Sequence, residues 1–398
     1  SRTMRSHKCR SRYRDYQPEY TVYCLGTPVR YIVMTDEDDD WPKPRANADL
    51  MGHKVTETIL LDAWNSKRFP HAWLVTGPQG IGKATLAFRF ARFMLAGGET
   101  IGQDTLFDNA LPDLVPDLSI SEDHPVFRRV AAEGHADLTT IQRTINPDTK
   151  KVRRDIVVAD VRAAGRSLHL TPGEAGWRII IVDAADEMNP SAANAILKML
   201  EEPPARTVFF LLSHAPGRLL PTIRSRCRRL RLEPLQPDLM ATLLTRYLPD
   251  LSEDDRMVLA ALGEGSIGAA LRLEQSGGLT LYREIMGLLG QLRDLNITGV
   301  HALGDKMARG EGFVTFTWLL SGWMSRLIGA AARGQNSRNC IPGEGTLMTT
   351  LATAANLAQW MEVWDKVNQM LTRAERVNLD QKQVVVGVFL ALQAVVKA

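Results

Sequence analysis

The sequence is poor in cysteine and contains no long apolar run. Only four cysteines occur among its 398 residues: Cys9, Cys24, Cys227 and Cys340. They are scattered along the chain, so neither a zinc knuckle nor a disulfide framework is indicated, and we expect no zinc. No stretch of 18 apolar residues is present, which argues against a transmembrane helix. We therefore expect a cytoplasmic protein in a reducing compartment, with no membrane partner.

Aromatic residues and net charge are also scarce, at 7% and +3. A chain with 45% hydrophobic and 23% charged residues is neither disordered throughout nor collagen-like. Its length predicts two or three domains, at roughly 150 residues each. The small net charge argues against a protein that coats DNA with a uniformly basic surface.

The positive charge is concentrated at the start of the sequence. Residues 1–33 carry seven basic side chains against Asp15 and Glu19, a net +5, so the other 365 residues sum to −2. The segment lacks the apolar core of a signal peptide. A basic arm that contacts nucleic acid is one interpretation. We favour an extension without a fold of its own, and expect residues 1–47 to be a disordered extension followed by an acidic and proline-rich linker.

A glycine-rich turn between an apolar strand and an amphipathic helix predicts a phosphate-binding loop. The strand is His71–Thr76, the turn is Gly77–Thr85, and the helix follows. Glycines let such a backbone curl so that its N–H groups point at phosphate oxygens, and the helix N-terminus adds partial positive charge. The lysine of the loop would reach the β and γ phosphates. The loop residues that would bind nucleotide are Gly77, Gly80, Gly82 and Lys83.

Two groups that an ATPase needs at such a loop are missing. The residue after Lys83 is Ala84, where a hydroxyl would bind Mg²⁺. Thr85 cannot simply replace it, because one helical step turns a side chain by about 100°, so we include Thr85 only as part of a degenerate site. The buried strand that ends at Asp183 offers a single carboxylate that would help to hold the metal, but Ala184 follows where a catalytic Glu is usual. A strand-end cap is the plain alternative for Asp183.

Two further motifs follow that strand. A helix is expected to start at Asn189-Pro190, which suit an N-cap and first position, and to end before Pro203-Pro204. An apolar strand ending at Ser213 comes next, and then a basic stretch that contains Ser225-Arg226-Cys227. By itself, Arg226 would be one solvated arginine among several.

The run from Asn194 to Pro204, together with Ser225-Arg226-Cys227, resembles the bacterial clamp-loader family of AAA+ proteins. Within that family the motifs are most similar to the delta prime subunits of DNA polymerase III, over about Asp49 to Leu273. Clamp loaders are pentamers that open a sliding clamp and place it on primed DNA. The resemblance implies that Arg226 is an arginine finger, supplied in trans to ATP on a neighbouring subunit. It also implies that Ser213 occupies the place of a polar phosphate sensor.

The departures from the ATPase pattern favour a stator, a subunit that donates a finger without hydrolysing ATP. Besides Ala84 and Ala184, Gly268 stands where ATPase subunits of the family place an arginine. The partners implied are gamma/tau and delta subunits in a hetero-pentamer, with the clamp and primed DNA reached through the complex. The chain itself is expected to be neither a polymerase nor an active ATPase, and ATP or ADP would bind only at a degenerate site.

The domain organisation expected from the resemblance has three parts after the linker. They are an α/β P-loop AAA+ core with a parallel sheet and flanking helices (48–233), a small helical lid (234–277) and an all-α collar for oligomerisation (278–398). One alternative is an ATP-hydrolysing motor subunit similar to gamma/tau. Another is an AAA+ remodeller unrelated to replication, against which the Ser-Arg-Cys motif argues.

Overall fold

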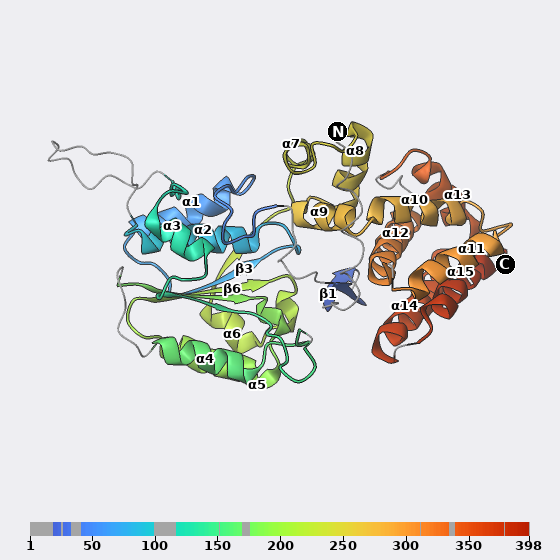
Figure 1. Ribbon diagram of the computed structural model, residues 1–398. Coiled ribbons are helices and arrows are strands. Elements are labelled where there is room, and N and C mark those ends of the chain that lie inside the picture. Colours follow the sequence, from blue (N-terminus) through green and yellow to red (C-terminus); the bar gives the residue numbers. More distant parts are fainter. Residues whose placement is uncertain are drawn as a thin grey trace, which may run out of the picture. The chain divides into compact units, whose positions relative to one another are not determined.

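The computed structural model describes residues 19–24, 27–32, 41–98, 117–150, 152–168, 176–310, 312–333, 339–377 and 379–397. The chain divides into two compact units: the first ends at Pro234, and the second consists of Leu235–Ala398 together with Tyr20–Ile32. Figure 1 shows a sheet covered by helices in the first unit and a helix-rich second unit. The predicted parallel-sheet core followed by a helix-rich C-terminal region is confirmed.

Two strands occur within the N-terminal segment. β1 spans Glu19–Cys24 and β2 spans Thr27–Ile32, and they form a two-stranded sheet. The sequence analysis expected no regular structure there. Tyrosine, threonine, valine and isoleucine make up most of both strands, and these residue types favour extended backbone. The first 18 residues, and with them most of the proposed basic arm, lie outside the described residues.

The sheet of the first unit has five parallel strands in the order β4-β5-β6-β3-β7. Their bounds are Ala72–Thr76 (β3), Leu138–Ile141 (β4), Arg178–Asp183 (β5), Thr207–Ser213 (β6) and Arg228–Arg231 (β7). The three central strands are almost fully buried, as their continuous apolar sequences predict for a sheet covered on both faces. β7 is an edge strand with exposed arginines.

Six helices cover the two faces of this sheet (Figure 1). They are α1 (Lys54–Asn65), α2 (Lys83–Leu95), α3 (Pro125–Ala131), α4 (Val158–Leu168), α5 (Pro190–Glu201) and α6 (Pro221–Arg226). Alternate residues of β3 face opposite sides: Trp73 lies in the core beneath α1 and α2, whereas Leu74 lies in the core beneath α4 and α5. Each face therefore has its own apolar core.

Local sequence determines where α5 begins and ends. The Asn189 side chain accepts a hydrogen bond from the Ala192 backbone N–H at 2.9 Å, and Pro190 occupies the first helical position. The helix stops at Glu201, just before Pro203-Pro204, because proline lacks the N–H that would continue it. The predicted start and end of this helix are confirmed.

The second unit consists mainly of helices. They are α7 (Pro237–Tyr247), α8 (Glu253–Leu262), α9 (Ile267–Gln275), α10 (Gly278–Leu289), α11 (Ile297–Ala308), α12 (Phe313–Arg333), α13 (Glu344–Ala354), α14 (Leu357–Val377) and α15 (Gln381–Lys397). The predicted division of this unit into a lid (234–277) and a collar (278–398) stays a prediction, because residues 235–398 form part of one compact unit. None of the described helices is long and apolar enough to cross a bilayer.

Candidate nucleotide loop and arginine finger

The turn after β3 adopts a backbone that requires glycine. Gly77, Gly80 and Gly82 have φ angles of +153°, +74° and +108°, which side chains disfavour. A Cβ atom on Gly77 would also lie only 2.8 Å from the Leu232 carbonyl oxygen. Gly82 is the N-cap of α2 and offers no capping side chain, so the first turn of the helix keeps N–H groups for another acceptor. This is the geometry that the sequence predicted for a phosphate loop.

Lys83 is bonded to the loop that precedes it. Its ammonium donates to the carbonyl oxygens of Gly77 at 2.9 Å and Pro78 at 2.7 Å, and the residue is only 8% exposed. These contacts join the lysine to the turn. Thr85 is also buried, one step around the helix from the half-exposed Ala84. The roles of Lys83 and Thr85 in nucleotide binding stay predictions.

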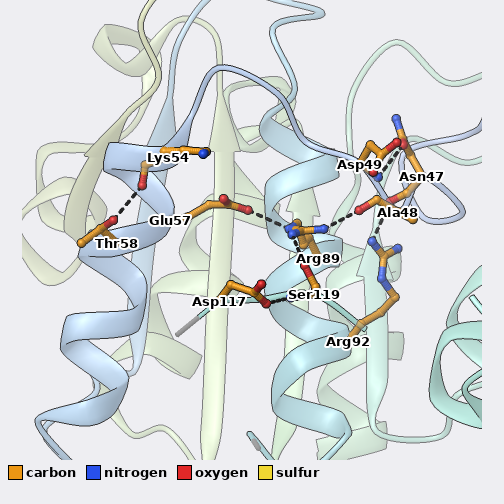
Figure 2. Close-up of polar contacts among 10 residues, drawn as sticks. All are labelled: Asn47, Ala48, Asp49, Lys54, Glu57, Thr58, Arg89, Arg92, Asp117 and Ser119. Carbon is orange, nitrogen blue, oxygen red and sulfur yellow. Dashed lines mark hydrogen bonds and ion pairs between the residues drawn. The ribbon is translucent and has the colours of Figure 1, made fainter. Parts of the chain in front are cut away.

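The loop and its helix are held from outside by residues near α1. The buried His53 donates from Nε2 to the Ile81 carbonyl at 2.9 Å, and burial lowers the pKa of this imidazole. Arg89 on α2 bonds Glu57 at 2.7 Å and also donates to the Ala48 carbonyl (Figure 2). The loop is thus fixed to the segment that precedes α1.

Arg92, one turn further along α2, extends the same anchorage. It is 1% exposed and donates to the carbonyls of Arg45 at 2.7 Å and Asn47 at 2.6 Å. Its guanidinium also lies over the Phe127 ring, 4.5 Å from the centroid. Burial, assisted by the nearby Arg89 charge, lowers the pKa of Arg92 to about 10, and the group stays charged at neutral pH. Sequence reasoning missed both arginines, because these contacts join positions more than 40 residues apart.

The predicted partners of the loop gather at the same edge of the sheet. Thr76, which precedes the loop, is the register partner of Ser213, and Asp183 is the partner of Leu212. Asp183 and Ser213 therefore lie at the carboxyl ends of neighbouring strands, beside the loop. Ser213 is fully buried, and its hydroxyl makes no hydrogen bond to a described residue. The structure brings these residues together as the sequence analysis expected.

The two acids after Asp183 are buried and are engaged away from the loop. Asp186 pairs with His214 at 3.1 Å and Glu187 pairs with Arg143 at 3.0 Å, all at sites with little exposure. Burial raises the pKa of Glu187 to about 9, against the opposing effect of Arg143. Their partners, His214 and Arg143, come from separate segments of the chain and could not be identified from the sequence.

Arg226 and the loop lie toward opposite ends of two neighbouring strands, β7 and β3. It is the last residue of α6 and precedes β7, whose Arg228 is the register partner of Trp73 and whose Arg231 is that of Thr76. The strands are parallel, so Arg226 precedes the amino end of β7, whereas the loop follows the carboxyl end of β3. Along the strand direction, the amino end of β7 and the carboxyl end of β3 are three residue steps apart, which is about 10 Å at 3.3 Å per residue.

The Arg226 side chain is exposed and has two partners. Its Nη2 atom donates to Glu201 Oε1 at 2.8 Å and its Nη1 atom to the Thr222 carbonyl at 3.1 Å. The neighbouring Cys227 is buried, which raises the pKa of its thiol to about 11 and keeps the thiol neutral and unreactive. Arg226 therefore presents a permanent positive charge toward solvent from the end of a short helix, next to the buried Cys227.

Comparison with known proteins addresses the segment that carries both sites. A family model described as "DNA polymerase III, delta subunit" matches residues 52–236. "DNA polymerase III subunit delta'" of Pseudomonas aeruginosa is 33% identical over 213 residues, covering 52% of this chain and 56% of the relative. The resemblance to delta prime subunits is confirmed. It covers the first unit of the structure, from just before α1 to the unit boundary.

Other relatives carry the names of subunits of the same polymerase. The Escherichia coli "DNA polymerase III subunit delta'" is 30% identical over 220 residues, covering 54% of this chain and 58% of the relative. "DNA polymerase III subunit gamma/tau" of Mycobacterium tuberculosis is 28% identical over 267 residues, covering 66% of this chain and 40% of the relative. The chain thus spans little more than half the length of the curated delta' relatives.

No candidate metal centre is found in the parts of the chain that the structure describes. There, no group of three or more His, Cys, Asp or Glu side chains could hold a metal ion. The predicted absence of zinc stays a prediction.

Gly268 lies in the first turn of α9, whose N-cap Ser266 accepts a hydrogen bond from the Ala269 N–H at 3.3 Å. This helix thus begins with Ile267 and Gly268, and Gly268 stands where the sequence analysis expected an arginine in ATPase subunits of the family.

Proposed function

We propose that this chain is a delta prime-like stator subunit of a bacterial DNA polymerase III clamp loader. In this function it would help to load the sliding clamp on primed DNA, in a cytoplasmic hetero-pentamer with gamma/tau and delta subunits. The similarity of residues 52–236 to named subunits of that polymerase supports the assignment. Contact with the clamp and with DNA would be made through the assembled complex.

The observation that carries the proposal is the position of Arg226. It precedes the amino end of β7, whereas the chain's own phosphate loop follows the carboxyl end of the neighbouring strand β3, and it is exposed and charged. We propose that an arginine so placed turns toward a phosphate on another molecule. A planar guanidinium can neutralise the charge that develops on a transferring phosphoryl group. We propose that Arg226 does this for ATP bound to the neighbouring subunit.

The chain's own loop would have a structural use. Lys83 already bonds two carbonyls of the loop, and the metal-binding hydroxyl and catalytic carboxylate are replaced by Ala84 and Ala184. Any ATP or ADP would bind at a degenerate site formed by the glycines of the loop, Lys83, Thr85, Asp183 and Ser213. We propose that such binding does not lead to hydrolysis.

The test is ATP turnover by the reconstituted loader with clamp and primed DNA. Arg226→Ala is compared with Arg229→Ala, which removes an exposed arginine of β7 three residues away. Hydrolysis at the site served by the finger should slow by about 10³-fold in Arg226→Ala. Total turnover falls less if other ATP sites keep their own fingers. Arg229→Ala should match the unmodified complex.

Two results would overturn the proposal. Equal turnover of the Arg226→Ala and Arg229→Ala complexes would contradict the proposal that Arg226 is an arginine finger. Rapid ATP hydrolysis by the isolated chain would instead favour a motor subunit, similar to gamma/tau, over a stator.

A further inference from the structure

The nearest charged neighbour of Arg226 is a carboxylate on another helix. Glu201 Oε1 accepts from Arg226 Nη2 at 2.8 Å, and the two side chains are 43% and 38% exposed. The Thr222 carbonyl accepts from Nη1 at 3.1 Å. The guanidinium is therefore held by two acceptors, one at the end of α5 and one in α6. These bonds use two of its five N–H donors, and three remain for another ligand.

Stability of the fold does not account for the position of Glu201. It is the last residue of α5, where the helix dipole favours cations and disfavours a carboxylate. An exposed ion pair contributes little stability in return. The two effects nearly cancel, so the pair contributes little to folding, and its main consequence is to restrict where the guanidinium can lie.

We infer that Glu201 is a positioning residue for Arg226, an inference that rests on the proposed function. A free arginine side chain samples many rotamers, and its conformational entropy is lost when it is fixed. The bonds to Glu201 and Thr222 fix it before the neighbour's ATP arrives, and transition-state stabilisation depends on such prior alignment. Glu201 would thereby raise the rate of hydrolysis on a subunit that it does not touch.

The adjacent residue provides a matched control. Glu202 is an exposed carboxylate one position further along, and within the described residues its side chain makes no hydrogen bond or ion pair. Changing Glu202 removes the same charge from the same helix end without removing a contact to Arg226. Any effect specific to Glu201 therefore reports the contact and not the local potential.

The experiment measures kcat and KM for ATP in the complete loader with Glu201→Ala, Glu201→Gln and Glu202→Ala. Glu201→Ala should lower kcat by about tenfold at nearly constant KM, because misalignment affects mainly the transition state. Glu201→Gln keeps an oxygen acceptor and should recover most of the rate. Glu202→Ala should match the unmodified loader, and the melting temperature of the chain should be the same for all three variants.

A double variant separates positioning from an independent effect. If Glu201 acts through Arg226, Glu201→Ala should lower the rate no further once Arg226→Ala is present. An equal loss in both backgrounds would overturn the inference, as would a Glu201→Ala loader that is as fast as, or faster than, the unmodified one. In those cases a slow Arg226→Ala loader would still support the finger. If Arg226→Ala itself had no effect, the proposed function would fail instead.

Discussion

Lys83 and Arg226 belong to the same α/β unit, lie toward opposite ends of its neighbouring strands β3 and β7, and differ in how their charges are bonded. Lys83 is 8% exposed and gives hydrogen bonds to two carbonyls of its own loop. Arg226 has a side chain 38% exposed, and its only charged partner among the described residues is the half-exposed Glu201. The first cation is largely used inside the chain, whereas the second keeps donors for another molecule.

This difference concerns what the chain would supply to an ATP site shared between two subunits: the phosphate loop or the arginine finger. Lys83 would exchange two hydrogen bonds to loop carbonyls before it bound phosphate. Arg226 is bonded to an exposed carboxylate and a carbonyl and meets no competition from a buried partner. This contrast supports our proposal that the chain gives a cation to a neighbour and does not itself hydrolyse ATP.

The largest effect that we expect within the chain concerns Lys83. Lys83→Met keeps the apolar stem but removes the two bonds to the loop, each made by a charged donor. It should lower the free energy of unfolding by about 2–3 kcal/mol without any nucleotide present. Denaturant unfolding of the full chain measures this. Lys198→Met, an exposed lysine of α5, is the control and should change stability by less than about 0.5 kcal/mol. A Lys83→Met protein as stable as this control would mean that the loop is not closed by its lysine.

The second prediction tests the buried acids beside Asp183. Burial raises the pKa of Glu187 from 4.5 to about 9, so the folded protein keeps a proton that the unfolded chain has lost. Stability should therefore fall as pH rises from about 4.5 toward 9, by at most about 1.4 kcal/mol per pH unit. Glu187→Gln mimics the protonated side chain and should flatten this decline. Unfolding measured at pH 6, 7 and 8 compares the two slopes, and parallel slopes would contradict the prediction.

The smallest effect is expected from restoring the missing ATPase groups. Ala84→Ser together with Ala184→Glu should leave the isolated chain without motor-like turnover. Ala184 is only 5% exposed, so a glutamate there enters an apolar position, and the arginine expected at Gly268 is still absent. Steady-state ATP hydrolysis decides the matter. A rate of about 1 s⁻¹ or more would show that the loop is a functional ATP site lacking only two side chains.

Much of the core could be predicted because its signals are local. The glycines of the loop, the apolar strand before it and the proline-bounded α5 each follow from a few neighbouring residues, and the structure has them as predicted. The N-terminal segment shows the opposite case. Its charge suggested disorder, yet its β-branched and aromatic residues form β1 and β2, because net charge does not cancel a strand preference.

The sequence by itself determined the backbone of the phosphate loop and the bounds of α5. The structure placed Arg226 in a short helix before an edge strand. Only the tertiary structure decided which groups satisfy the charges. Lys83 donates hydrogen bonds to its own loop, Arg92 donates to carbonyls more than 40 residues away, and Arg226 donates to Glu201 at the end of another helix. The physical reason is that turns and caps are short-range interactions, whereas a buried or shared charge takes whichever partner the packing of distant segments brings within hydrogen-bond distance.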